Sequence, residues 1–186
     1  RMGYGAMRIT GKGIWGPPDD REEAIKVLKR GIELGVNFVD TAHSYGPYVS
    51  EELIAEALYP YPEDLVSATK GGLTRIGPDQ GPVNSHPDHL KEALEGSLKR
   101  LKLDRIDLFQ LHRIDPKVPA EQTFEFLKKV QDEGKVKHLG LSEVSVADIK
   151  KAQKYFGVVS VQNKYSIDNR TWEPVLEYCR ENNIAF

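Results

Sequence analysis

Four side chains that can move a proton or hold a charge are placed where parallel strands would bring them together. Asp40, Lys70 and His112 each close a short apolar run, and Tyr45 follows Asp40 by five residues. A tyrosine hydroxyl, with an unperturbed pKa of about 10, can donate a proton to a developing alkoxide. A neighbouring lysine ammonium favours the phenolate that this transfer leaves, and an aspartate can hold that ammonium charged and oriented.

An imidazole beside these groups, here His112, can orient a carbonyl oxygen by hydrogen bonding. Donors directed at a developing oxyanion contribute strongly to catalysis. The set therefore suits the reduction of a carbonyl group, and because no side chain supplies hydride, the reaction requires a nicotinamide cofactor. A lysine at a strand end can also act as a Schiff-base nucleophile. An aldolase that uses Lys70 is thus an alternative, although that chemistry needs a neutral amine.

Short apolar runs alternate along the chain with longer amphipathic segments, which is the pattern of strands followed by helices. Such alternation, without tandem hairpins, predicts parallel strands joined by helical crossovers. We expect a first strand near Gly3–Gly5, further strands at 36–40, 65–69, 107–111, 136–141 and 158–162, and helices at 21–34, 50–58, 89–101, 119–133, 146–155 and 172–182.

The polar residues that end these strands follow one another at intervals of 30, 42, 30 and 20 residues, from Asp40 to Gln162. A unit of about 30 residues is typical of a βα repeat. A doubly wound dinucleotide fold would need a G-x-G-x-x-G turn after its first strand, and Gly3-Tyr4-Gly5 lacks the third glycine. We therefore predict an α/β protein of the (β/α)8 TIM-barrel class, in which the carboxyl ends of the strands surround one mouth.

The stretch from Asp40 to Gly46, D-T-A-H-S-Y-G, followed by Glu51-Glu52-Leu53-Ile54, resembles the signature of the aldo-keto reductases. The resemblance continues at Thr69-Lys70, at 107–112 (D-L-F-Q-L-H), at 140–142 (G-L-S) and at 161–163 (V-Q-N). It extends from Met2 to Phe186.

That resemblance implies a barrel that binds NADP(H), in preference to NAD(H), and that reduces an aldehyde or ketone or catalyses the reverse oxidation. Tyr45 would be the proton donor, Asp40 and Lys70 its tuning pair, and His112 would position the carbonyl. The implied cofactor contacts are Gly5, Ala6, Met7, Asp40, Ser142 and Gln162, and the implied substrate contacts are Trp15, Tyr45 and His112. Some relatives in this family are sensors, so a cofactor-binding regulatory subunit is a further alternative.

One position departs from the family pattern. The family commonly has Ser-Asn where this chain has Ser142-Glu143. An ionised glutamate only accepts hydrogen bonds, so Glu143 is a weaker candidate for a carboxamide contact. Arg113 is predicted to be a solvated loop charge rather than a group that steers an anionic substrate. His86 and His89 form an H-x-x-H pair without a third ligand, so we predict no metal site.

Composition narrows the classes of partner. The 186 residues include 26 Lys and Arg against 28 Asp and Glu, a net charge of −2. This balance argues against nucleic acid or an anionic membrane, and no apolar stretch approaches the roughly 18 residues that a membrane helix needs. The single Cys179 fits a reducing compartment. We predict a cytoplasmic protein whose partner is a small-molecule carbonyl or alcohol. The sequence does not indicate the oligomeric state.

Length sets a further expectation. A closed barrel of this type takes about 250 residues. The pattern supplies about six βα units and the opening of a seventh strand at Ile184. We therefore expect residues 1–186 to form one barrel domain whose C-terminal part is missing.

Overall fold

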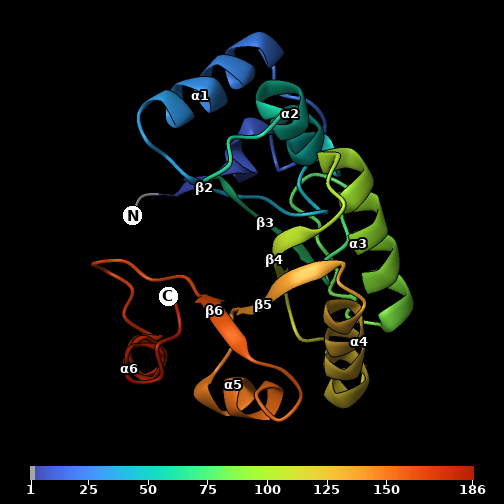
Figure 1. The fold of residues 1–186 in the computed structure, drawn as a ribbon, viewed down its shortest axis with the longest axis vertical. Coiled ribbons are helices and arrows are strands. Elements are labelled where there is room, and N and C mark those ends of the chain that lie inside the picture. Colours follow the sequence, from blue (N-terminus) through green and yellow to red (C-terminus); the bar gives the residue numbers. More distant parts are fainter. Residues whose placement is uncertain (1–2) are drawn as a thin grey trace.

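The computed structural model describes residues 3–186, and Met2, at which the resemblance begins, lies outside them. Within the described residues, six parallel strands form one sheet in chain order (Figure 1). The strands are β1 (Tyr4–Gly5), β2 (Phe38–Asp40), β3 (Val66–Gly71), β4 (Ile106–Leu111), β5 (Val136–Ser142) and β6 (Val158–Gln162). The helices are α1 (Arg21–Glu33), α2 (Val49–Leu58), α3 (Pro87–Leu101), α4 (Ala120–Asp132), α5 (Val146–Ala152) and α6 (Glu173–Glu181), and a 3-10 helix, η1 (Ala6–Ile9), follows β1.

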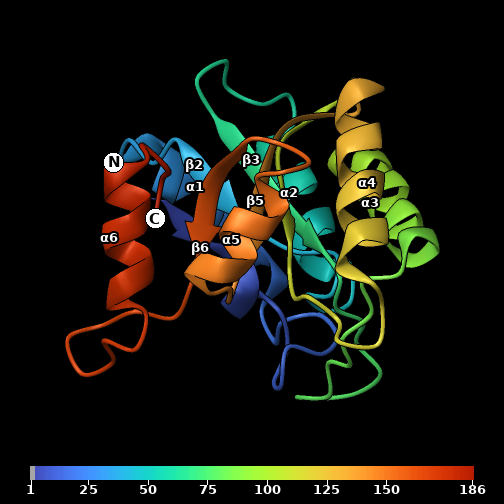
Figure 2. The ribbon, with the colours of Figure 1, turned by 90° about the horizontal axis from the view of Figure 1, so that it is seen from below.

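The sheet curls around a central space and the helices cover its outer face (Figures 1 and 2). β1 and β6 are its two edges. Beyond β6, Ala185 forms a parallel bridge with Ser160, and its carbonyl accepts from the Val161 N–H at 2.8 Å. The chain therefore begins a seventh strand where one was predicted. This arrangement is an incomplete (β/α)8 barrel, which confirms the predicted fold class.

Local sequence explains where the helices begin. α5 opens with a capping box, in which Ser145 and Asp148 each accept the backbone N–H of the other with their side chains. α3 begins at Pro87, two residues before the predicted start at His89. The earlier start arises because proline is tolerated in a first helical turn, and the ring of His86 accepts from a backbone N–H of that turn.

The hydrophobic core lies between the strands and the surrounding helices. Leu90, Leu94 and Leu101 recur at helical spacing along α3, and all three are buried in one cluster with Phe109 of β4. Cys179 is buried in α6 as part of the same core, and burial raises the pKa of its thiol. This cysteine is therefore a packing residue.

The parallel register brings polar strand ends around one edge of the curled sheet. Asp40 pairs with Ala68, which lies two residues before Lys70 and so on the same face of β3. Lys70 pairs in turn with Gln110, two residues before His112. Each strand is thus displaced along its neighbour, as closure of a barrel requires, and the polar side chains follow one another around the mouth.

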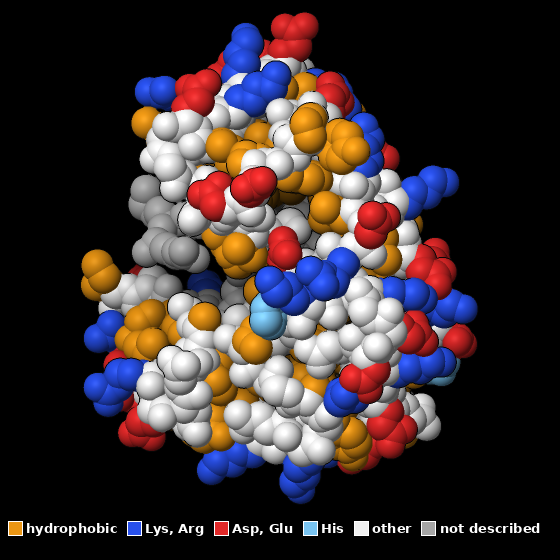
Figure 3. Space-filling view, in the orientation of Figure 1, with side chains coloured by type: hydrophobic (Ala, Val, Ile, Leu, Met, Phe, Trp, Pro, Cys, Tyr) orange, Lys and Arg blue, Asp and Glu red, His pale blue; other side chains and the backbone are white. Residues whose placement is uncertain are grey.

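The surface mixes acidic and basic side chains, and the face in Figure 3 is hollowed near its centre. Among residues 3–186, no helix has the length and apolarity to traverse a lipid bilayer.

Gly140 of β5 lies between Gln110 of β4 and Ser160 of β6. The Gln110 amide donates to the Ser160 hydroxyl at 3.2 Å, across the position where a side chain of β5 would stand. A Cβ at Gly140 would lie 2.9 Å from the Ser160 carbonyl oxygen and 3.0 Å from Gln110 Cγ, and it would also meet the Ser160 hydroxyl. This interior hydrogen bond therefore requires glycine at position 140.

We predict that Gly140→Ala lowers the free energy of unfolding by about 1–3 kcal/mol, because the methyl group overpacks the interior and separates a hydrogen-bonded pair. Urea denaturation followed by circular dichroism measures the change. Gly157→Ala is the matched control, since nothing lies within 4 Å of a Cβ added there. Equal stability of the two variants would contradict this interpretation.

Candidate active site

Lys70 and Asp40 form a close ion pair at the ends of β3 and β2. The Lys70 ammonium lies 2.7 Å from both carboxylate oxygens of Asp40 and 2.9 Å from the carbonyl oxygen of Thr41. The Lys70 side chain is fully buried, whereas 13% of the Asp40 side chain is exposed. A buried ammonium is tolerated when it is paired and hydrogen-bonded, as the Lys70 ammonium is here.

Tyr45 lies on the loop after β2, which folds back over the mouth. The His43 N–H donates to the Lys70 carbonyl at 3.1 Å, and the Ser50 N–H of α2 donates to the Tyr45 carbonyl at 3.2 Å. These bonds fix the loop so that the Tyr45 hydroxyl lies 3.5 Å from the Lys70 ammonium. Because Tyr45 is only 7% exposed, the two groups meet where little water reaches them.

His112 follows β4, and its ring packs edge-on against Tyr45 with 5.8 Å between the ring centroids. The side chain is buried, and its Nδ1 has no hydrogen-bond partner among residues 3–186. Burial, followed by the charges of Lys70, Arg113 and Arg75, lowers the pKa of His112 well below its usual value. The imidazole is therefore neutral at physiological pH and carries one N–H that can be donated.

Tyr45 and His112 line a cavity of about 340 Å³, which we call the mouth cavity. Its wall is completed by residues from η1, from the ends of β5 and β6 and from the neighbouring loops: Met7, Ile14, Leu73, Arg75, Arg113, Ser142, Glu143, Gln162, Asn163 and Lys164. The Tyr45 hydroxyl and the His112 imidazole thus face a space in which a small molecule can be held.

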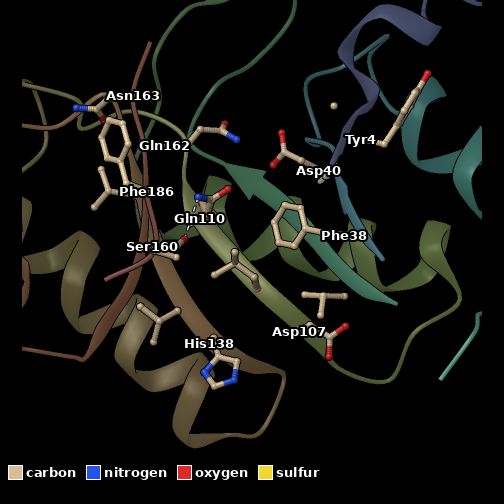
Figure 4. Close-up of a pocket in the computed structure, with 17 residues that line it drawn as sticks. Tyr4, Phe38, Asp40, Asp107, Gln110, His138, Ser160, Gln162, Asn163 and Phe186 are labelled. Carbon is tan, nitrogen blue, oxygen red and sulfur yellow. Dashed lines mark hydrogen bonds between the residues drawn. The ribbon is translucent and has the colours of Figure 1, made fainter. Parts of the chain in front are cut away.

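A second cavity, of about 500 Å³, occupies the interior of the curled sheet. Figure 4 shows Asp40 and Gln162 at one end of this interior cavity and Asp107 and His138 at the other. Gln162 lines both cavities, so the polar strand ends form the rim between them.

The residues predicted to hold a nicotinamide reach the two cavities in different ways. Ser142 and Gln162 are register partners on β5 and β6, and both line the mouth cavity. Met7 lines the same cavity and Gly5 lines the interior one. Ala6 is fully buried, and its carbonyl accepts a side-chain hydrogen bond from α2. Of this set, Ser142 and Gln162 offer side-chain donors and acceptors to a ligand.

Trp15, predicted to form a substrate wall, lies beside the site. Its backbone is bridged to Gly46, the residue directly after Tyr45, and the residue is 40% exposed. Ile14 rather than Trp15 lines the mouth cavity. The substrate-binding role of Trp15 stays a prediction.

Glu143 and Asn163 connect the loops that follow β5 and β6. The Glu143 carboxylate accepts from the Lys164 N–H. The Asn163 amide pairs with the backbone of Val144, accepting from its N–H at 3.1 Å and donating to its carbonyl at 2.8 Å. These polar groups are engaged within the protein, which leaves Ser142 and Gln162 as the better candidates for ligand contacts.

The prediction that Arg113 is a solvated loop charge is wrong. Its Nη1 donates to the Ser142 hydroxyl at 3.0 Å and to the His112 carbonyl at 2.5 Å. The side chain is half-buried and lines the mouth cavity. The long Arg113 side chain folds back over the strand ends, and a position in a loop does not indicate in which direction a side chain points.

Sequence reasoning also missed a buried charged network behind the mouth. Glu51 of α2 is fully buried, where it accepts from the Thr69 hydroxyl at 2.6 Å and from Arg100 Nε at 2.7 Å. Arg100 Nη2 lies 3.0 Å from His43 Nδ1. The available signal was a carboxylate on the apolar face of α2, one helical turn before Ile54. Because Thr69 precedes Lys70, this network supports the strand that carries the ammonium.

His43 is held in its neutral form by its surroundings. Burial lowers the pKa of His43 to about 3, and the charge of Arg100 and the ring of His89 add to the shift. In the unfolded chain a histidine takes up a proton near pH 6.5. The stability contributed by neutral His43 is therefore fully present above that pH, and it is lost as the pH falls from 6.5 toward 3.

His43 and His112 are both neutral in the folded protein. As the pH falls below 6.5, and before the carboxylates titrate, each should therefore lower the free energy of unfolding by about 1.4 kcal/mol per pH unit. His43→Gln keeps an acceptor for Arg100 and should remove the contribution of His43, about 1.4 kcal/mol per pH unit. Urea denaturation at a series of pH values measures it. His138→Gln, on the exposed start of β5, is the control. A wild-type slope in His43→Gln would show that His43 does not contribute.

Comparison of the sequence with known proteins finds relatives along the whole chain. The model of the Aldo/keto reductase family matches residues 1–186. An uncharacterized oxidoreductase from Schizosaccharomyces pombe is 54% identical over 186 residues, which span 100% of this chain and 60% of that protein. Pyridoxine 4-dehydrogenase from Escherichia coli is 41% identical over 194 aligned positions, which span 100% of this chain and 67% of that enzyme.

Solved structures share the fold. Glycerol dehydrogenase from Gluconobacter oxydans matches with a TM-score of 0.89 at 31% identity, over 98% of this chain and 57% of that one. An aldo-keto reductase from Klebsiella pneumoniae, solved with NADPH, matches with a TM-score of 0.77 at 25% identity, over 98% of this chain and 60% of that one. With a family model that matches the whole chain and a shared barrel fold, the chain belongs to the aldo/keto reductase family.

Proposed function

We propose that the protein is an NADP(H)-dependent oxidoreductase that reduces an aldehyde or ketone to an alcohol and catalyses the reverse oxidation. Residues 1–186 would be one domain that carries the reacting side chains. The observation behind this proposal is the 3.5 Å approach of the Tyr45 hydroxyl to the Lys70 ammonium, beside a cavity that His112 also lines. These groups are a proton donor, a cation that favours its deprotonated form and a hydrogen-bond donor for a carbonyl oxygen.

The polar groups of the mouth cavity suit a nicotinamide carboxamide, which both donates and accepts hydrogen bonds. The Ser142 hydroxyl and the Gln162 amide also do both. Arg113 donates to the Ser142 oxygen, so the hydroxyl proton can be donated to a ligand. When bound, the cofactor supplies the hydride that no side chain can provide. We propose as its contacts Gly5, Ala6, Met7, Asp40, Ser142 and Gln162.

Tyr45 moves the proton in this mechanism. As the carbonyl oxygen gains negative charge, the Tyr45 hydroxyl transfers its proton to that oxygen and becomes a phenolate. The Lys70 ammonium stabilises the phenolate. Asp40 contacts the ammonium with both carboxylate oxygens and so holds it in place. In the oxidation direction the same phenolate accepts the proton of the alcohol.

His112 orients the carbonyl oxygen. Because the imidazole is neutral, it donates a hydrogen bond to the oxygen but does not act as a second acid beside Tyr45. Its edge-on packing against Tyr45 places both donors on one side of the mouth cavity. Burial of both rings excludes water, which strengthens each hydrogen bond to the developing oxyanion.

The relatives support the choice of cofactor and of reaction. The Klebsiella pneumoniae reductase was solved with NADPH, which supports NADP(H). The dehydrogenases of pyridoxine and of glycerol act on alcohols by their names, which supports an alcohol–carbonyl pair. A cytoplasmic location stays a prediction.

The contacts of Lys70 argue against the aldolase alternative, because a Schiff-base nucleophile needs a neutral nitrogen directed at its substrate. Lys70 instead donates to Asp40, to the Thr41 carbonyl and to the Tyr45 oxygen, so its three protons have partners.

We predict that Tyr45→Phe lowers kcat by about 10²- to 10⁴-fold, because it removes the proton donor, and leaves NADPH affinity largely unchanged. The absorbance of NADPH follows turnover, and fluorescence titration measures affinity. Tyr48→Phe, on the same loop, is the matched control, since it keeps the ring that stacks on Arg100. Wild-type turnover by Tyr45→Phe would overturn the proposal. Tight NADPH binding by the wild type with no carbonyl turnover would favour the regulatory subunit.

We also predict that borohydride, added with carbonyl compounds that the protein turns over, traps no adduct on Lys70. Mass spectrometry of the peptide that contains Lys70 measures this, and the exposed Lys154 reports background modification. A borohydride-dependent adduct on Lys70 alone would support the aldolase instead.

A further inference from the structure

The mouth cavity carries more positive charge than the proposed reaction uses. Arg75, Arg113 and Lys164 line it, together with one carboxylate, that of Glu143. Within the described part of the chain, neither arginine forms an ion pair with a carboxylate, although many other basic side chains do. The wall of this cavity thus holds two guanidinium groups whose charge is not neutralised by the neighbouring side chains.

Neutral oxygens hold both guanidinium groups in place. Arg113 donates to the Ser142 hydroxyl and to the His112 carbonyl. Arg75 donates through Nε to the Ser44 carbonyl at 3.4 Å. A guanidinium has five N–H donors, so each arginine keeps several N–H groups for a ligand. Both residues are half-buried, which fixes their direction and strengthens their attraction for an anion.

The two arginines are held next to Tyr45 and His112, the residues proposed to contact the carbonyl oxygen. Arg113 directly follows His112 in the chain, and the Ser44 carbonyl that holds Arg75 directly precedes Tyr45. Both arginines also line the mouth cavity together with His112 and Tyr45. An anion between them would therefore belong to the molecule whose carbonyl group meets Tyr45 and His112.

We propose that Arg75 and Arg113 bind an anionic group, a carboxylate or a phosphate, carried by the carbonyl substrate. This proposal rests on the proposed function and names the chemical class of its substrate. The planar guanidinium fork matches two oxygens of either anion, which gives direction as well as attraction.

The phosphates of the cofactor are the other anions to consider. Arg113 is bonded to Ser142, which is proposed to contact the uncharged carboxamide. This bond puts Arg113 at the reacting end of the cofactor rather than beside its phosphates. The substrate is therefore the better source of the anion, and cofactor affinity enters the test.

The test uses the whole protein and two pairs of aldehydes that differ in charge. The first pair is 4-carboxybenzaldehyde and its neutral methyl ester, and the second is glyceraldehyde 3-phosphate and glyceraldehyde. The measured quantity is the ratio of kcat/KM for the anionic aldehyde to that for its neutral partner. We expect a ratio of roughly ten or more for at least one pair, which also distinguishes carboxylate from phosphate.

Arg75→Met and Arg113→Met should each lower that ratio roughly tenfold, because each removes a charge-assisted hydrogen bond. Arg113→Lys, which keeps the charge but loses the fork, should fall between wild type and Arg113→Met. Lys154→Met, which removes an exposed cation outside the lining of the mouth cavity, is the control and should leave the ratio unchanged.

Equal kcat/KM values within both pairs, or arginine variants that leave the ratio unchanged, would overturn the proposal. Weaker NADPH binding in the arginine variants at an unchanged ratio would assign the arginines to the cofactor and also overturn it. If the wild type reduces none of the four aldehydes, the proposed function fails for these compounds. Calorimetric titration with the two anionic aldehydes then tests the site alone: binding that needs both arginines supports it, and binding that does not overturns it.

Discussion

The fully buried ammonium of Lys70 is the constraint on which the mouth of this barrel depends. Removing a charge from water costs several kcal/mol, which only close partners can offset. Those partners are both oxygens of Asp40 and the carbonyl of Thr41, all from β2 or the loop after it. The displacement of β3 along β2 is what brings them within reach. Because this loop must turn its carbonyl toward Lys70, it also turns back over the mouth and brings the Tyr45 hydroxyl to the same ammonium. Burial of the Lys70 charge and placement of the Tyr45 hydroxyl are thus one structural requirement.

A second buried charge supports the same strand from behind. Successive side chains of a strand point to opposite faces, so Thr69 and Lys70 lead in opposite directions from β3. Lys70 meets Asp40 at the mouth, while Thr69 donates to the buried carboxylate of Glu51, which Arg100 of α3 neutralises. The segment from Asp40 to Glu51 therefore supplies partners to both faces of β3. The need to supply partners on both faces of β3 is a physical reason for the many polar residues among these twelve positions, which lie between apolar segments.

The sequence predicts the convergence of Asp40, Lys70 and His112 because parallel strands must bring their carboxyl ends to one mouth, whatever the details of packing. The barrel and most helix positions follow from the same alternation. The burial of Glu51 does not follow, because an unpaired carboxylate belongs in solvent and the partner that allows its burial, Arg100, is 49 residues away. The direction of Arg113 depends on Ser142, 29 residues later in the chain. Such side chains are directed by tertiary partners, which no local pattern specifies. The position of Trp15 likewise follows only from the fold, which places its backbone beside Gly46.

The neutral state of His112 depends mainly on its burial and less on the cations around it. Burial is the largest cause of its lowered pKa, ahead of Lys70, Arg113 and Arg75. An anion bound between the two arginines would offset part of their field and shift the pKa back toward its usual value. It would leave the burial unchanged, so the imidazole would stay neutral and keep its donor N–H. The phenolate of Tyr45 would likewise keep its support, because Lys70 contacts the tyrosine oxygen directly and is held by Asp40. The mouth could therefore accept the proposed anionic substrate and keep the charge arrangement that the proposed proton transfer requires.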